Sequence, residues 1–205
     1  MTHELFLGRD VSRETSERLD YFVELLKKWS KSINLVSRST MEHVWHRHIA
    51  DSAQIWPLAP ESAYTWADLG SGGGLPGMVI AILAHEFRPA LRVTLVESDL
   101  RKSAFLATAS RELDLTATVL AKRIEEVPPL KADVVSARAL APLDRLLPLA
   151  ARHLGENATG LFPKGVKHVD ELEAALASWR FTHETYKSKT ESEAVIYKIG
   201  GLSRA

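Results

Sequence analysis

The stretch "DLGSGGGLPG", residues 68–77, decides the fold. It holds five glycines within eight positions, whereas a turn that only packs a helix against a strand needs one or two. The strand-like "YTWADL" runs into it and the helix-like "LPGMVIAILAHE" runs out of it. In α/β proteins a ligand binds beyond the carboxyl end of such a strand, where the first N–H groups of the helix attract negative charge. Residues 68–77 are therefore expected to form a ligand-binding loop.

Strands and helices alternate along the rest of the chain. Apolar runs typical of buried strands are separated by runs typical of helices, which indicates a parallel α/β sheet covered on both faces. The last two strand-like runs have no helix between them, so we expect an antiparallel hairpin at the edge of the sheet. The expected strands are 64–69, 91–98, 117–121, 132–137, 159–165, 180–187 and 193–200, and the expected helices after residue 70 are 75–86, 100–113, 142–155 and 169–179.

The chain before the loop has a helical pattern. Apolar residues three and four apart predict an amphipathic helix over residues 12–33 and a second helix over residues 41–56. Ser39 and Glu42 have the spacing of a capping box for the second helix. We expect an N-terminal helical cap, residues 1–60, on an α/β core, residues 61–205, with both parts forming one compact unit.

Composition narrows the function classes. The 205 residues include 26 basic and 26 acidic side chains, so no overall basic field indicates a nucleic-acid partner. The absence of cysteine removes thiolate metal sites and cysteine nucleophiles. The N-terminus lacks the pattern of a signal peptide and the longest apolar run is too short to span a bilayer, so we expect a cytoplasmic protein without a membrane partner.

Three histidines near the end of the expected cap raise the question of a metal. His43, His46 and His48 lie close together in the sequence, but no carboxylate completes a set of ligands, and no metal is expected. His48 and Asp51 stand three residues apart on one helix face. We expect them to form a hydrogen-bonded pair that closes the cap over the site.

Two ligands compete for the glycine loop. "GGGLPG" matches the G-x-G-x-x-G motif of dinucleotide sites and leaves an NAD(P)-dependent oxidoreductase as an alternative. The carboxylate of Asp68, however, would repel a pyrophosphate and attract the ammonium group of S-adenosylmethionine. The D-x-G-x-G-x-G spacing of Asp68, Gly70, Gly72 and Gly74 therefore favours the methyl donor. Glu97 ends the next strand, 23 residues after Gly74, where an acid bonds the ribose hydroxyls of either ligand.

Several blocks in a fixed order carry a family resemblance. They are "INL", "RHIADS", "DLGSGGGLPG", "LVESDLRKSAFL", "KRIEE", "VVSARALAPL" and "FPKG". With them the chain, from about Trp29 to Gly165, resembles the bacterial RsmG (GidB) family of 16S rRNA guanine-N7 methyltransferases. The resemblance implies a class I methyltransferase fold with a Rossmann-like sheet, S-adenosylmethionine as cofactor, and methylation of N7 of a guanine near the decoding region of the small subunit.

The resemblance also implies site residues. It places donor contacts at Gly70 and Leu75 in the loop, and at Ile124 and Glu125 beside the adenine. Arg138, in "SARA", would line both the donor and the substrate site. The valine in "INLVS" and the alanine in "RHIADS" depart from the family pattern, and these differences concern the packing of the cap.

The chemistry of N7 fits these residues. A guanine N7 has a free lone pair, so its methylation needs no general base, and holding the reacting atoms in line is sufficient. Arg138 is the expected catalytic residue because an arginine suits recognition of a guanine edge or a phosphate. The alternative is a structural partnership of Arg138 with Asp133 or Asp99. Arg123 and Lys164 follow strands and are expected to contact RNA.

The expected partner is 16S rRNA. Neutral net charge predicts weak affinity for naked RNA and favours the small subunit or an assembly intermediate as the substrate of a monomeric enzyme. The oxidoreductase alternative lacks a Tyr-x-x-x-Lys pair. A donor-binding, RNA-associated factor without turnover stays open, since none of the expected site residues is a covalent catalyst.

Overall fold

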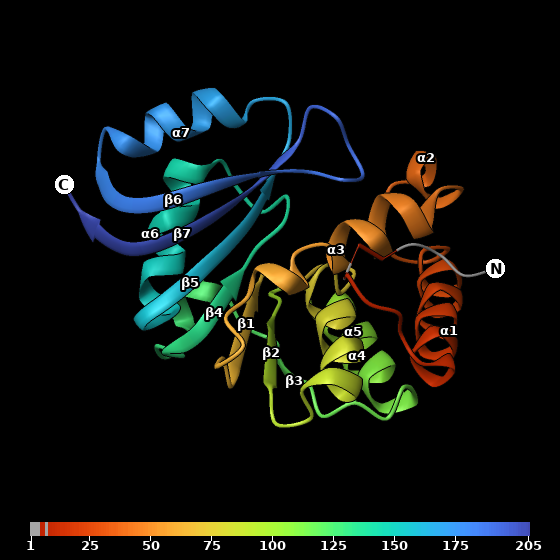
Figure 1. The fold of residues 1–205 in the computed structure, drawn as a ribbon. Helices are drawn as coiled ribbons and strands as arrows, with labels where there is room; N and C mark the ends of the chain where they lie inside the picture. The colour runs from red at the N-terminus through yellow and green to blue at the C-terminus, as the bar shows by residue number, and fades with distance from the viewer. Residues whose placement is uncertain (1–4, 7) are drawn as a thin grey trace.

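A seven-stranded sheet forms the centre of the computed structural model, which describes residues 5, 6 and 8–205 (Figure 1). The strand order is β3-β2-β1-β4-β5-β7-β6, with the first five strands parallel and β7 antiparallel to both of its neighbours. This confirms the predicted parallel sheet with an antiparallel hairpin at its edge. The strands are β1 (Thr65–Leu69), β2 (Arg92–Val96), β3 (Thr118–Leu120), β4 (Ala132–Ser136), β5 (Leu154–Lys164), β6 (Trp179–Lys187) and β7 (Val195–Arg204).

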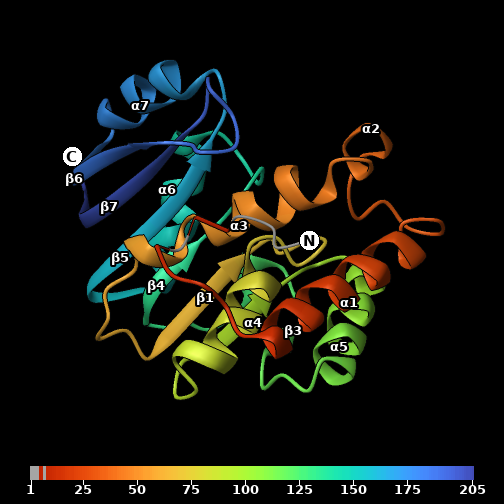
Figure 2. The ribbon, with the colours of Figure 1, turned by 45° about the vertical axis from the view of Figure 1, so that its right-hand side comes forward.

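Helices cover both faces of the sheet (Figures 1 and 2). On one side lie α1 (Arg13–Trp29), α4 (Gly77–Phe87) and α5 (Leu100–Glu112), and on the other α6 (Leu143–His153) and α7 (His168–Leu176). Successive residues of β1 point to opposite faces, so Trp66 joins the first hydrophobic cluster and Ala67 joins the second. Eight consecutive residues of α4 are buried, because this helix lies between the sheet and α1.

The first cap helix agrees with the sequence. Helix α1 (Arg13–Trp29) begins at Ser12, whose Oγ accepts a hydrogen bond from the N–H of Thr15. Its apolar stripe packs on α4 and α5, with the ring of Phe22 stacked at 6.3 Å from that of Phe105. The cap and the core therefore share one hydrophobic cluster.

The second cap helix is broken, unlike the sequence prediction. It consists of α2 (Arg38–Met41), a π-helical turn η1 (Trp45–Ala50), α3 (Asp51–Ala53) and the 3-10 turn η2 (Trp56–Leu58). The predicted capping box was wrong, because Ser37 rather than Ser39 stands at the start of α2. Within the described part of the chain, no helix combines the length and apolar character needed to cross a membrane.

Candidate functional site

The glycine loop follows β1 and lies beside the end of β2. The N–H groups of Gly70 and Ser71 donate to the carbonyl of Val96 at 2.8 and 3.0 Å. Gly70, Gly72 and Gly74 have φ values of 67°, 55° and 79°, a region that side chains disfavour. The sequence therefore needs glycine at these three positions for the chain to turn back into α4.

The glycines of the loop divide into two groups. Gly70 and Gly72 line a cavity of about 430 Å³, which we name the loop cavity. Gly74 and Gly77 instead allow close packing: a Cβ on Gly74 would stand 2.7 Å from Cβ of Met78, and one on Gly77 would stand 2.4 Å from Cδ2 of Leu95. Some glycines of the loop therefore keep the cavity wall free of side chains, and others allow helix α4 to pack closely on the sheet.

Asp68 differs from the sequence expectation. Its side chain is fully buried and lies behind the loop, where Oδ1 accepts from the hydroxyl of Ser136 at 2.7 Å and Oδ2 from the N–H of Gly77 at 3.1 Å. Burial raises the pKa of Asp68 to about 6, although hydrogen bonds from Ser136, Ser71 and Gly77 oppose the rise. The carboxylate therefore connects β1 to β4 and α4 by hydrogen bonds, and it does not line the loop cavity.

The other expected donor residues, except Gly74, line the loop cavity. Glu97 lies at its edge, where Oε2 accepts from the N–H of Gly72 at 2.8 Å and Oε1 from that of Asp99 at 2.8 Å. The remaining expected residues in its lining are Gly70, Gly72, Leu75, Arg123, Ile124, Glu125 and Arg138. Gly74 is absent from that lining because it faces Met78, Leu106 and Phe22.

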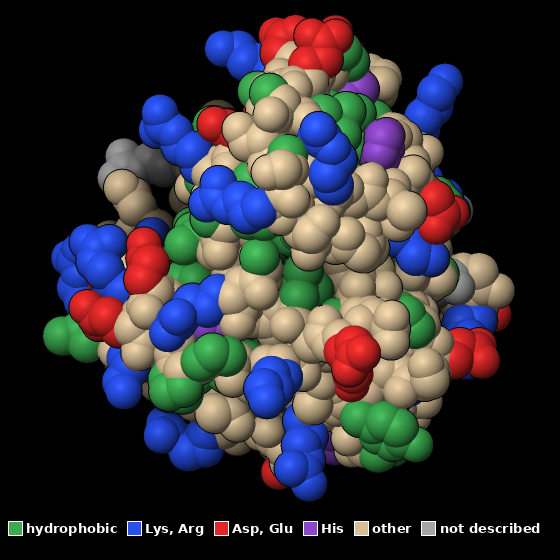
Figure 3. All heavy atoms as spheres, turned by 90° about the vertical axis from the view of Figure 1, so that its left-hand side faces the viewer, with side chains coloured by type: hydrophobic (Ala, Val, Ile, Leu, Met, Phe, Trp, Pro, Cys, Tyr) green, Lys and Arg blue, Asp and Glu red, His purple; other side chains and the backbone are tan. Residues whose placement is uncertain are grey.

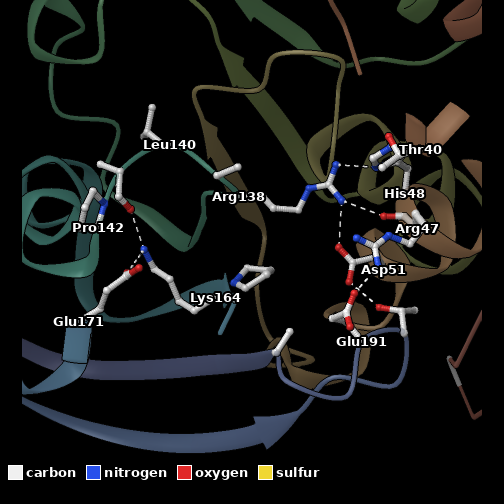
Figure 4. Close-up of a pocket in the computed structure, with 16 residues that line it drawn as sticks. Thr40, Arg47, His48, Asp51, Arg138, Leu140, Pro142, Lys164, Glu171 and Glu191 are labelled. Atoms are coloured by element: carbon white, nitrogen blue, oxygen red, sulfur yellow. Dashed lines mark hydrogen bonds and ion pairs between the residues drawn. The ribbon is translucent and has the colours of Figure 1, made fainter. Parts of the chain in front are cut away.

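A second cavity of about 630 Å³ opens between the cap and the sheet, and we name it the cap cavity (Figure 4). Its lining comes from α2, the π-helical turn and α3, the segment after β4, the end of β5, α7, and the loop between β6 and β7. Arg138, Ala139 and Leu140 line both cavities. Ala139 has a φ of 54°, which is strained for a residue with a side chain and is a feature found at functional sites.

Arg138 is held by the cap. Its guanidinium donates from Nη1 to Oδ2 of Asp51 at 2.9 Å, and Nη2 lies 3.3 Å from Nδ1 of His48 (Figure 4). Neither alternative partner from the sequence contacts it. Asp133 accepts bonds from Tyr64 and Thr65, and Asp99 caps helix α5.

His48 and Asp51 meet through Arg138 rather than by the direct hydrogen bond that we expected. Burial, followed by the positive charge of Arg138, lowers the pKa of His48 to about 4, so the ring is neutral at pH 7. Its Nδ1 faces the donor group of Arg138 and is assigned as the acceptor, which leaves the proton on Nε2. That nitrogen lies 2.8 Å from Oγ1 of Thr40.

Lys164 also differs from expectation. Its side chain is only 7% exposed, and Nζ forms an ion pair with Oε2 of Glu171 at 2.9 Å. The same nitrogen donates to the carbonyl of Ala141 at 2.6 Å. Lys164 therefore lines the cap cavity as a neutralised pair and is not a free surface cation, whereas Arg123 is exposed at the rim of the loop cavity.

Among the residues of the cap cavity that sequence reasoning missed are Glu171 and Thr190. Glu171 comes from α7 and Thr190 from the β6–β7 loop, and neither belongs to a motif. No local signal marks them, because each reaches the site only through the packing of the C-terminal hairpin and α7. Across residues 5, 6 and 8–205, no group of three or more His, Cys, Asp or Glu side chains that could hold a metal ion is found, and this search included His43, His46 and His48.

The surface over α6, α7 and the C-terminal strands carries lysine and arginine side chains singly and in small groups (Figure 3). Acidic side chains lie among them, so this face shows no continuous positive field. The arrangement agrees with the neutral net charge of the chain.

Comparisons with known proteins give consistent matches. The family model described as rRNA small subunit methyltransferase G (GidB) matches residues 15–196. A protein of Cereibacter sphaeroides named ribosomal RNA small subunit methyltransferase G is 54% identical over 203 residues, which cover 99% of this chain and 98% of that protein.

Solved structures share the fold at low identity. MtNAS in complex with S-adenosylmethionine is 14% identical, with a TM-score of 0.59 over 91% of this chain and 75% of that chain. A TehB-like SAM-dependent methyltransferase from Corynebacterium glutamicum is 15% identical, with a TM-score of 0.56 over 90% of this chain and 98% of that chain. The sheet and its helices therefore form the class I, Rossmann-like fold that the sequence predicted.

Proposed function

The chain belongs to the rRNA small subunit methyltransferase G (GidB) family, and we propose that it transfers a methyl group from S-adenosylmethionine to N7 of a guanine in 16S rRNA. It is an S-adenosylmethionine-dependent rRNA methyltransferase, and family membership favours this activity over the NAD(P)-dependent alternative. The observation that carries the choice of sites is that two cavities meet at Arg138, Ala139 and Leu140. A methyl transfer needs a donor and an acceptor side by side, and the shared wall provides that arrangement.

The loop cavity fits the methyl donor. Its volume lies in the range of small-molecule sites. Space is open in front of Gly72, because a Cβ added there would have no neighbour closer than 3.8 Å. Glu97 would accept from the ribose hydroxyls and Ile124 would lie against the adenine, with Glu125, Gly70, Gly72 and Leu75 completing the contacts. Asp68 and Gly74 would act from behind, by holding the loop in shape. When bound, the cofactor supplies an electrophilic methyl group on its sulfonium.

The cap cavity would hold the target base. Its three carboxylates each form an ion pair, Asp51 with Arg138, Glu171 with Lys164, and Glu191 with Arg47. Methylation of N7 needs no base because no proton leaves before the methyl is transferred. The paired groups can therefore shape the cavity and bind polar edges of the nucleotide, with Arg138 oriented towards both ligands.

The context of the RNA is also part of the proposal. Arg123 would contact RNA at the rim of the loop cavity. Neutral charge and scattered basic side chains favour a substrate presented by the small subunit or an assembly intermediate in the cytoplasm, rather than naked RNA. We also propose a monomer as the working unit, with residues 1–60 acting as a cap on the core of residues 61–205.

Calorimetry and methyl transfer test the proposal together. S-adenosylmethionine should bind and NAD should not, and tritium from a labelled methyl group should appear at guanine N7 of unmodified small subunits. Binding without transfer would instead support an RNA-associated factor without turnover. Transfer to a protein-free transcript at the same rate as to subunits would contradict the preference for an assembled particle.

A further inference from the structure

We propose that Asp51 is a positioning residue for methyl transfer, because its carboxylate fixes the guanidinium of Arg138 at the wall between the two cavities. The inference rests on the function proposed above for that wall. Asp51 belongs to α3 in the cap, while Arg138 follows β4 in the core. The contact therefore makes the cap a part of the reaction site and gives it a role beyond that of a cover.

Both oxygens of Asp51 have partners (Figure 4). Oδ2 accepts from Nη1 of Arg138 at 2.9 Å, while Oδ1 accepts from Oγ1 of Thr190 at 2.6 Å and from Nε2 of Gln54 at 2.8 Å. Three donors on two oxygens fix the plane of the carboxylate. An arginine facing this carboxylate is thereby given one preferred orientation.

Gln54, which donates to Asp51, is itself held by hydrogen bonds. Gln54 is 4% exposed, and its Oε1 accepts from the N–H of Lys189 at 2.8 Å. Its Nε2 also reaches Oγ of Ser188 at 3.1 Å. Asp51 is thus fixed by the loop between β6 and β7, so an element near the C-terminus determines where an N-terminal carboxylate points.

Arg138 needs such positioning because its side chain is long and stands between two open spaces. Ordering an arginine side chain costs rotamer entropy, a cost that fixed acceptors offset before the ligands arrive. Asp51 supplies the only carboxylate bonded to it among the described residues. The other acceptors, Nδ1 of His48 and the carbonyl of Arg47 at 3.4 Å, belong to the adjoining π-helical turn, a structure frequent at functional sites.

A double-mutant cycle tests the role. Asp51→Asn keeps the shape of the side chain but removes the charge that orients Arg138, and it should lower kcat/KM for small subunits by about tenfold or more, mainly through kcat. Arg138→Gln should have an effect at least as large. The double variant should be no slower than Arg138→Gln alone, because residues that act as one unit are not additive.

Asp133→Asn is the matched control. Asp133 accepts three bonds from Tyr64 and Thr65, but at the other end of β4, away from both cavities. Its loss should lower the midpoint of thermal unfolding and combine additively with Arg138→Gln in kcat/KM. If the fold-losses in kcat/KM of Asp51→Asn and Arg138→Gln also multiply, within about twofold, Asp51 contributes only to stability and the proposal is wrong.

Thr190→Val is a second variant that tests the role of Asp51 if Asp51→Asn folds poorly. It removes one donor from Oδ1 of Asp51 with little change of shape, and should lower kcat about three- to fivefold, an effect that disappears in the Arg138→Gln background. Wild-type transfer is measured first: its absence contradicts the proposed function, whereas transfer with additive cycles contradicts only the role of Asp51.

Discussion

The loop cavity and the cap cavity adjoin each other but are built in different ways. The loop cavity is formed by the turns after β1, β2, β3 and β4, where backbone atoms and a few strand-end side chains give the shape. The cap cavity is formed by side chains from the cap, from the segment after β4, and from elements after residue 160. One site depends on local conformation, and the other depends on contacts between distant segments. Substitutions should therefore damage the two cavities by different mechanisms.

The largest expected effect is on the loop cavity, from Gly74→Ala. The new Cβ would meet Cβ of Met78 at 2.7 Å at a φ of 79°, so both the contact and the backbone are unfavourable. We expect a loss of about 3 to 4 kcal/mol in the free energy of unfolding, measured by urea denaturation, and loss of S-adenosylmethionine binding by calorimetry. Gly200→Ala, whose Cβ would meet only Oγ1 of Thr182 at 3.4 Å, is the control and should change neither quantity strongly. Unaltered stability of Gly74→Ala would show that the loop is not fixed by this packing.

The next effect concerns the cap cavity and Lys164→Met. Removing the ammonium leaves Glu171 without its ion-pair partner in a largely buried place, so we expect a loss of about 2 kcal/mol in the free energy of unfolding. The salt dependence of RNA binding should stay the same, because the charge of Lys164 is already neutralised by Glu171.

Arg123→Gln is the matched comparison. Arg123 is exposed, so its loss should leave stability unchanged but lower the slope of log affinity against log salt by about 0.7 to 0.9, as one phosphate contact would. If Lys164→Met lowers this slope and Arg123→Gln does not, the positions of the two cations in RNA binding are the reverse of those proposed.

Glu97→Gln should have a smaller effect, on the loop cavity alone. The amide keeps one acceptor but replaces the other with a donor, which would face the N–H of Gly72 or Asp99. We expect the Kd for S-adenosylmethionine to rise about tenfold, with kcat on small subunits recovered at saturating donor. A fall in kcat that donor cannot restore would indicate that Glu97 also acts on the transfer step.

The same contrast explains what the sequence could predict. The parallel sheet, the edge hairpin and most of the loop cavity follow from patterns within short windows: alternating strands and helices, and glycines at fixed spacings. Asp68 shows the limit of such reasoning. Its position before the loop predicted a ligand contact, but β1 turns alternate residues to opposite faces, and this side chain points towards Gly77 and Ser136.

The cap cavity was less predictable because its contacts span long distances in the chain. Lys164 was expected from the sequence to contact RNA, but the packing of α7 places Glu171 beside its ammonium group. The partner of Arg138 proved to be Asp51, 87 residues away, and not Asp133 or Asp99. A basic residue in a motif identifies a site, but only the fold shows which acid neutralises it.

The smallest effect is a pH dependence in the cap cavity, where His48 lies beside Arg138. The folded protein holds the pKa of this ring at about 4, while an unfolded histidine titrates near 6.5. As pH falls from 6.5 to 4, the unfolded chain therefore binds a proton that the folded protein does not, and stability decreases. His48→Asn removes this loss, so the stability advantage of the wild type over the variant should shrink over that window, by about 1 kcal/mol after solvent screening of the partly exposed ring. In Arg138→Gln, where one cause of the low pKa is absent, the decrease should end above pH 4. NMR titration of the ring measures the shift directly, and a folded-state pKa of His48 near 6.5 would show that the ring is not buried beside Arg138 as the structure describes.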